Sequence, residues 1–238
     1  MDQPVTRVGP PPGRQLGVNC LVCLEQKPLS LEHALASQLF TYPDAPRVQT
    51  DCLDCNKLLG ECEADFERDP FVQQAKKALY PISFRDSDRK GWKFQTELAH
   101  HYAKPGFQCL YGPDGEVASV TAPDPTDEVW RAVGKSMLVS ALILVGNDVF
   151  HPSLDLVRKF VHLGGSAWDA GLRRGPNPKQ GQWDDYHEIR AVRISPEKSA
   201  LFIDLFARYS FYLECGVPLL LPENALAVVF RCMAATGS

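Results

Sequence analysis

Four cysteines in two closely spaced pairs are the residues of this chain best suited to bind a metal ion. They stand as Cys20-x-x-Cys23 and Cys52-x-x-Cys55, with 28 residues between the two pairs. Two such pairs supply four thiolates, the ligand set of a closed tetrahedral zinc site. Because sulfur occupies all four positions, this zinc ion would stabilise the fold and would take no part in catalysis. Any catalytic centre must therefore use other residues.

A second set of residues, close to the cysteines, suits acid–base and cation chemistry. Glu32 and His33 lie between the pairs, Asn56 directly follows Cys55, and Glu63 comes seven residues later. Carboxylate and amide oxygens are ligands that Mg²⁺ accepts, and a neutral imidazole with a pKa of about 6.5 can take a proton from water near pH 7. Seven residues are about two helical turns, so Asn56 and Glu63 would share one helix face. The structural alternatives are a histidine buried in a zinc module, a helix-capping asparagine and solvent-exposed carboxylates.

Together these motifs resemble the HNH endonuclease family in its zinc-knuckle form, which reads C-x-x-C, then Asp or Glu followed by His, then C-x-x-C-N. The resemblance covers roughly residues 18–70. It implies a ββα-metal fold in which the histidine ends the first strand and the asparagine opens the helix. It also implies that His33 is the general base, while Glu32 and Asn56 bind a catalytic Mg²⁺ or Mn²⁺. Glu63 is a candidate for a further ligand of that cation.

The chain departs from the family pattern at three places. Glutamate stands where aspartate is commoner before the histidine, which lengthens the ligand but keeps its charge. His33 is followed by Ala34 and lacks the proline usually found soon after it, and residues 47–51 contain no asparagine to orient the histidine. Without a replacement for that contact, we expect weak catalysis.

These residues need an α+β fold to position them. We expect a flexible, proline-rich tail over residues 1–16, a zinc-stabilised HNH-like module over 17–75, and an α+β accessory region over 76–238 that shapes access to the substrate. In the module, apolar residues at helical spacing predict a helix that begins near Asn56 and ends by Pro70.

The accessory region contains helical segments followed by antiparallel strands. A helix is predicted over 126–146, capped by Thr126 or Asp127, and a second over 152–162, ended by Gly164 and Gly165. Residues 111–115 predict a turn between two short strands. Three further strands are predicted over 186–194, 200–207 and 209–217, the last two forming a hairpin.

Composition indicates an ordinary globular protein of 238 residues, 45% of them hydrophobic, with a net charge of −4. Residues 76–110 reverse that charge, with seven lysines and arginines against three acidic residues, and aromatic residues lie among them. That pattern suits contact with a phosphodiester backbone, or else is a solvated face above core aromatics. We expect a cytoplasmic protein without a membrane segment, because no signal peptide is recognisable and the longest apolar run covers only residues 137–145.

The function favoured by the sequence is a metal-dependent endonuclease that hydrolyses phosphodiester bonds in DNA, with RNA as the alternative substrate, in phage defence, a mobile element or DNA processing. The alternative is a non-catalytic, zinc-stabilised adaptor that binds nucleic acid or protein. A redox role for the cysteine pairs is a third hypothesis, which one zinc per chain would exclude. The remaining cysteines, Cys62, Cys109, Cys215 and Cys232, are expected to be structural thiols. The oligomeric state is left open.

Overall fold

The computed structural model describes residues 13–33, 35, 47–69, 72–73, 108–111, 117–121, 124–175, 186–195, 198–206, 209–216 and 226–231. These residues form a mixed arrangement of helices and antiparallel strands. Most of the predicted flexible tail and nearly all of the basic, aromatic stretch over 76–110 lie outside the described residues.

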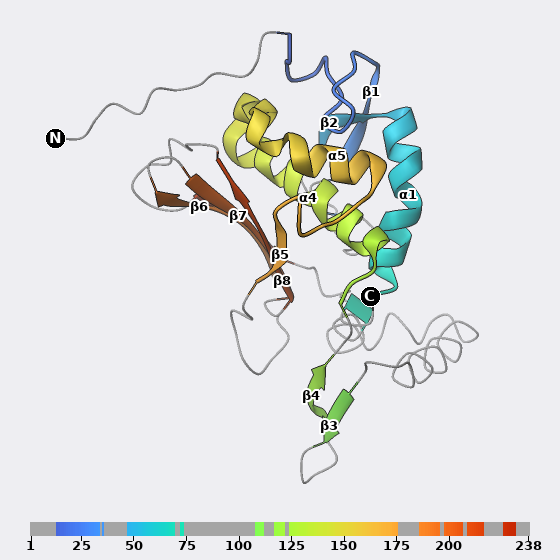
Figure 1. Cartoon of the computed structure of the whole chain (residues 1–238), viewed down its shortest axis with the longest axis vertical. Coiled ribbons are helices and arrows are strands. Elements are labelled where there is room, and N and C mark those ends of the chain that lie inside the picture. The colour runs from blue at the N-terminus through green and yellow to red at the C-terminus, as the bar shows by residue number, and fades with distance from the viewer. Residues whose placement is uncertain are drawn as a thin grey trace, which may run out of the picture.

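The N-terminal part is a β-hairpin followed directly by a helix (Figure 1). Strand β1 (Leu29–His33) pairs antiparallel with β2 (Arg47–Cys52), and His33 lies opposite Arg47. Helix α1 (Leu53–Glu67) starts at the residue after β2. It therefore begins three residues earlier than predicted, which places Asn56 in its first turn.

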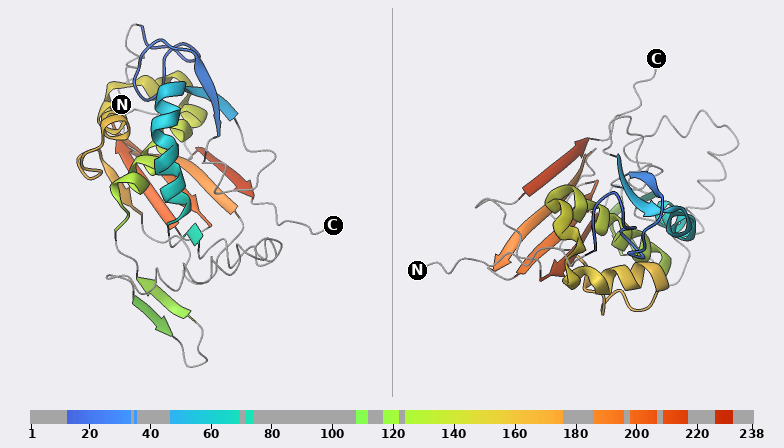
Figure 2. Two further views of the ribbon diagram at one scale, coloured as in Figure 1. Left: turned by 90° about the vertical axis from the view of Figure 1, so that its right-hand side faces the viewer. Right: turned by 90° about the horizontal axis from the view of Figure 1, so that it is seen from above.

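Helix α1 has one buried face, because Cys55, Leu59, Cys62 and Phe66 recur every three to four residues. Leu58, outside this buried face, is 44% exposed. The buried face of α1 packs against helix α4 (Asp127–Val145), which lies between α1 and a β-sheet (Figures 1 and 2). Helix α4 thus contacts α1 on one side and the sheet on the other, and most of its residues from Val129 to Leu142 are buried.

The predicted start of α4 is confirmed, because the hydroxyl oxygen of Thr126 accepts a hydrogen bond from the backbone N–H of Val129 at 3.4 Å. After the 3₁₀ turns η2 (Gly146–Phe150) and η3 (Pro152–Leu154), helix α5 (Asp155–Leu163) packs against α4. Helix α5 ends as predicted at Gly164, whose φ of 79° is accessible at little cost only to glycine.

A five-stranded antiparallel sheet covers α4 on the side away from α1 (Figure 2). Its strand order is β5 (Leu172–Arg174), β8 (Tyr209–Cys215), β7 (Lys198–Leu205), β6 (Tyr186–Ser195) and β9 (Leu226–Arg231). The three predicted strands correspond to β6, β7 and β8, while β5 and β9 were not predicted. A separate hairpin joins β3 (Gln108–Tyr111) and β4 (Val117–Thr121), as the predicted turn at 111–115 requires.

Residues 127–150, which comprise α4 and η2, are by length and composition able to cross a membrane. Two thirds of the most apolar window in this segment (67%) is buried inside the fold. A mostly buried core helix passes the same test, and α4 lies between two packed layers.

Candidate metal centre and the adjoining carboxylate cluster

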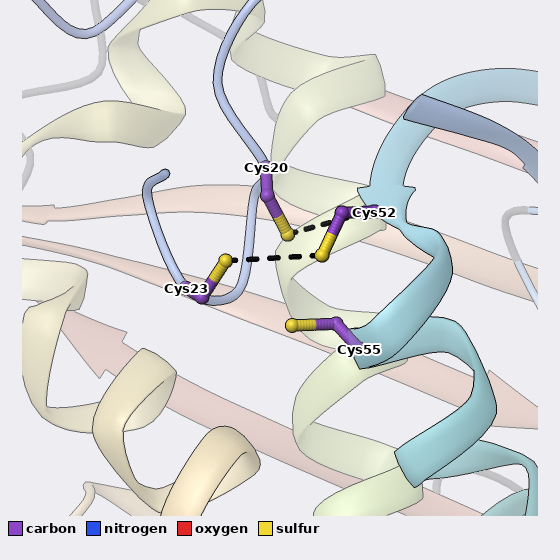
Figure 3. A group of neighbouring side chains, drawn as sticks. All are labelled: Cys20, Cys23, Cys52 and Cys55. Carbon is purple, nitrogen blue, oxygen red and sulfur yellow. Dashed lines mark hydrogen bonds between the residues drawn. The ribbon is translucent and has the colours of Figure 1, made fainter. Parts of the chain in front are cut away.

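The four predicted zinc ligands come together at the junction of the hairpin and α1 (Figure 3). Cys20 and Cys23 lie in a turn that precedes β1, Cys52 ends β2, and Cys55 lies in the first turn of α1. All four Sγ atoms are within 4.8 Å of one another, and those of Cys23 and Cys52 are 3.9 Å apart. Tetrahedral zinc with Zn–S bonds of about 2.3 Å separates its sulfur ligands by about 3.8 Å. The cluster can therefore hold a structural metal ion such as zinc.

Backbone hydrogen bonds shape the turn that carries the first cysteine pair. The N–H of Cys20 donates to the carbonyl of Glu25 at 2.9 Å, and the N–H of Leu24 donates back to the carbonyl of Cys20 at 2.9 Å. Leu24 has a φ of 66°, which lets the chain reverse within this short turn. The N–H of Cys52 donates to Cys20 Sγ at 3.3 Å, so a direct hydrogen bond also joins the two pairs.

A buried arginine attaches this turn to the helical layer. Arg158 of α5 is 2% exposed, and its guanidinium donates to the carbonyl oxygens of Leu21, at 3.1 Å, and of Val149. It also forms an ion pair with Asp155 at 2.7 Å. Burial lowers the pKa of Arg158 to about 10, so the side chain stays charged at neutral pH. The residues between Cys20 and Cys23 are thus bound to a helix about 137 positions away in sequence.

Three carboxylates beside the cysteine cluster converge on one lysine. The Nζ atom of Lys135, in the middle of α4, lies 2.7 Å from Glu63 Oε1 of α1, 3.1 Å from Glu32 Oε2 of β1 and 3.4 Å from Asp51 Oδ2 of β2. The lysine side chain is 4% exposed, and that of Asp51 is fully buried. Each of the three elements of the N-terminal module therefore supplies one carboxylate to a common point, and α4 supplies the positive charge.

The charges in this cluster do not balance. Burial opposes the charge on Lys135, but Glu63 and Asp51 outweigh burial and raise its pKa, so the ammonium is retained. Burial raises the pKa of Asp51 to about 7, although Lys135 acts in the opposite direction. Neither carboxylate oxygen of Asp51 accepts a hydrogen bond among the described residues. One ammonium thus faces up to three carboxylates, which leaves excess negative charge in a largely buried site.

His33 and Asn56, the other predicted site residues, are each half-buried, and His33 lies near this cluster. Burial and the positive charge of Arg47 lower the pKa of His33, while Glu32 and Glu63 act to raise it, so the imidazole lies within electrostatic range of both carboxylates. Its Nδ1 atom is buried and has no hydrogen-bond partner in the described part of the chain. No hydrogen bond or ion pair between described residues joins His33 or Asn56 to the Lys135 cluster.

Two members of the cluster were missed by the sequence analysis. Asp51 carried a signal, because it directly precedes the first cysteine of the second pair. Lys135 is the only charged residue between Arg131 and Asp148, and a lone lysine in an apolar helix requires buried anionic partners. The sequence does not show which carboxylates those partners are, since Glu32 and Glu63 are 103 and 72 positions away.

Comparisons with protein-family models, with curated proteins and with solved structures find no match to this chain.

Proposed function

We propose that residues 17–75 are an HNH-type ββα-metal module and that the protein is a metal-dependent endonuclease acting on DNA phosphodiester bonds. The order of hairpin and helix agrees with such a module, with Glu32 and His33 at the end of β1 and Asn56 in the first turn of α1. One observation carries the proposal. Carboxylate oxygens from β1, β2 and α1 already surround a single cationic group, the ammonium of Lys135.

The excess negative charge of this cluster is what a divalent cation would neutralise. Glu32, Asn56 and Glu63 would supply oxygen ligands, and Asp51 adds a carboxylate that accepts no hydrogen bond from the described residues. A bound Mg²⁺ or Mn²⁺ would polarise the scissile phosphate and stabilise the leaving oxygen. Lys135 competes with that cation for Glu32 and Glu63, so we expect cation binding to be weak and strongly dependent on concentration.

His33 would take the proton from the attacking water. Its pKa is lowered chiefly by burial, so the imidazole is neutral near pH 7 and able to accept a proton. His33 ends β1 next to Glu32, which places the base one residue from a cation ligand. In this arrangement, the zinc ion has a structural role, because it fixes β2 and the start of α1 relative to the turn before β1.

Lys135 also supports a second candidate function, a non-catalytic adaptor. An ammonium that already contacts Glu32, Asp51 and Glu63 can replace a divalent cation and preserve the module without catalysis. The two functions differ in their response to added cations, because a cluster neutralised by Lys135 alone would gain neither stability nor activity from Mg²⁺ or Mn²⁺.

Nicking of supercoiled plasmid DNA tests the proposal. The wild-type protein should convert the plasmid to open-circle and linear forms in Mg²⁺ or Mn²⁺, and His33→Ala should reduce the rate by at least about 100-fold, the usual contribution of a general base. His162→Ala, on α5, is the matched control and should retain activity. Zinc content and circular dichroism should be unchanged in both variants. Equal activity of wild type and His33→Ala would reject the proposal, and inactivity of both would favour the adaptor.

A further inference from the structure

The sheet carries a row of basic and aromatic side chains on the face that points away from α4. Arg173 of β5 pairs in register with Tyr212 of β8, Tyr212 with Phe202 of β7, and Phe202 with Arg190 of β6. The rings of Phe202 and Tyr212 are stacked, 5.7 Å apart with an interplanar angle of 28°, and the guanidinium of Arg190 lies 4.8 Å from the Phe202 ring. Leu172, next to Arg173, is buried towards α4, as strand alternation requires.

Beside edge strand β5 this row continues into a cavity of about 420 Å³. Aromatic side chains that line it are Trp130, Trp168 and Tyr212, and charged ones are Arg173, Arg174 and Asp124. The guanidinium of Arg173 lies 3.3 Å from the centre of the Trp168 ring. A cavity of this size is in the range of small-molecule pockets and is large enough for one planar base with its attached sugar.

The exposure of Trp168 is not explained by packing, whereas Arg173 beside it is half-buried. Trp168 is 68% exposed, although tryptophan is usually among the more buried residues. Arg173 donates to the carbonyl oxygens of Trp168, at 2.6 Å, and Leu172, at 2.8 Å. These bonds fix the guanidinium against the indole and leave a flat aromatic and cationic surface facing solvent.

We propose that this surface binds unpaired DNA: one base enters the cavity against Trp168 and Tyr212, and the neighbouring phosphates meet Arg173 and Arg174. Stacking on aromatic rings beside arginines is the usual way to bind a single strand without sequence preference, and a duplex offers no free base face. Among the described residues that line the cavity are two arginines and one aspartate, so these side chains carry a net positive charge although the whole chain is acidic. The inference rests on the proposed nuclease function for its choice of DNA and makes single-stranded segments the substrate class.

Fluorescence anisotropy with a labelled 12-nucleotide single strand tests this inference, using the full chain with His33→Ala and no added divalent cation. Trp168→Ala and Arg173→Ala should each raise the Kd by about 5- to 150-fold, the range for loss of one base stack, while Trp168→Phe should retain most of the affinity. Leu163→Ala, a change at another exposed apolar residue, should have no effect. The duplex of the same sequence should bind at least about tenfold more weakly than the single strand.

Three outcomes would overturn the inference: unchanged affinity in Trp168→Ala and Arg173→Ala, equal affinity for duplex and single strand, or free deoxyadenosine monophosphate binding as tightly as the strand. The last would identify a nucleotide pocket. Because no cation is added, this test is independent of cleavage. Loss of plasmid nicking with retained strand binding would reject only the nuclease, and nicking without any effect of Trp168→Ala on binding would reject only this surface.

Discussion

Lys135 is the residue that most directly links the N-terminal module to the remainder of the fold. Its ammonium is buried in an apolar helix and contacts three carboxylates. Removal of one partner from a buried ion pair typically costs about 3–5 kcal/mol, because the remaining charge loses its compensation. The side chain therefore contributes strongly to stability in the absence of another cation, whatever the function.

Lys135→Met tests whether the cluster accepts a divalent cation. Methionine has a similar length without the charge, so in the absence of divalent cations the free energy of unfolding should fall by about 3–5 kcal/mol. Mn²⁺ should restore much of this loss, because it would bind the carboxylates that Lys135 no longer neutralises. Chemical denaturation with and without millimolar Mn²⁺ measures both effects. Lys159→Met, at an exposed position on α5, is the control; a destabilised Lys135→Met that does not respond to Mn²⁺ would argue against a cation site.

His187 provides a pH-dependent contribution to stability outside the candidate site. It is fully buried, burial lowers its pKa well below the usual value, and its Nδ1 atom accepts a hydrogen bond from the N–H of Phe206 at 3.1 Å. In the unfolded chain, His187 binds a proton below about pH 6.5, whereas in the folded chain it stays neutral to lower pH. The contribution of His187 is thus complete above pH 6.5 and is lost as pH falls, by up to about 1.4 kcal/mol per pH unit.

The variant His187→Asn should remove this dependence. An asparagine oxygen can accept the bond from Phe206, so the variant should be moderately less stable at pH 7.5 but should lose less stability between pH 6.5 and 5. Urea denaturation of both proteins at pH 7.5, 6.5, 5.5 and 5.0 gives the comparison, in which effects shared by the two proteins cancel. Parallel curves for the two proteins would show that His187 does not titrate in this way.

The contact between α4 and α5 depends on a glycine. A Cβ atom at Gly134 would lie 2.6 Å from Val161 Cγ2, and Val161 is fully buried. Gly134→Ala should therefore destabilise the protein by about 1–3 kcal/mol, despite the higher helix propensity of alanine. Adding Val161→Ala should recover part of the loss. At Gly60, an exposed position of α1, an added Cβ meets no atom within 4 Å, so Gly60→Ala should stabilise the protein by about 0.5–1 kcal/mol. Thermal unfolding of wild type and the three variants measures these differences.

Helix ends and longer strands were predictable because their signals are local. Thr126 caps α4 and Gly164 ends α5, as their residue types predict, and β6 to β8 follow stretches rich in β-branched and aromatic residues. Strand β5 was missed because three residues are too few to show alternation. The convergence of the four cysteines was also predictable, because two cysteine pairs at this spacing commonly bind one zinc ion together. The pairing of Lys135 with Glu32 and Glu63 was not, since it depends on how α4 packs against α1.

Zinc should stabilise the fold as a whole, because its four ligands connect the turn before β1, the end of β2 and the start of α1. We expect one zinc ion per chain, and its removal by a strong chelator should unfold the N-terminal module. Cys55→Ser should lose the metal, whereas Cys62→Ser, seven residues later on the same helix, should keep it. Elemental analysis and hydrogen exchange over residues 13–69 measure these outcomes. A chain that retains full protection after zinc loss would contradict this role of the metal.

The position of α4 between two layers has a practical consequence for dissecting this protein. A fragment ending near residue 75 would keep Glu32, Asp51 and Glu63 but lose the lysine that neutralises them, together with Arg158, which attaches the first cysteine turn. Mutual repulsion among the acidic groups would then oppose closure of the hairpin on the helix. Fragments made for recombinant work should therefore extend at least through α5, so that they keep both Lys135 and Arg158.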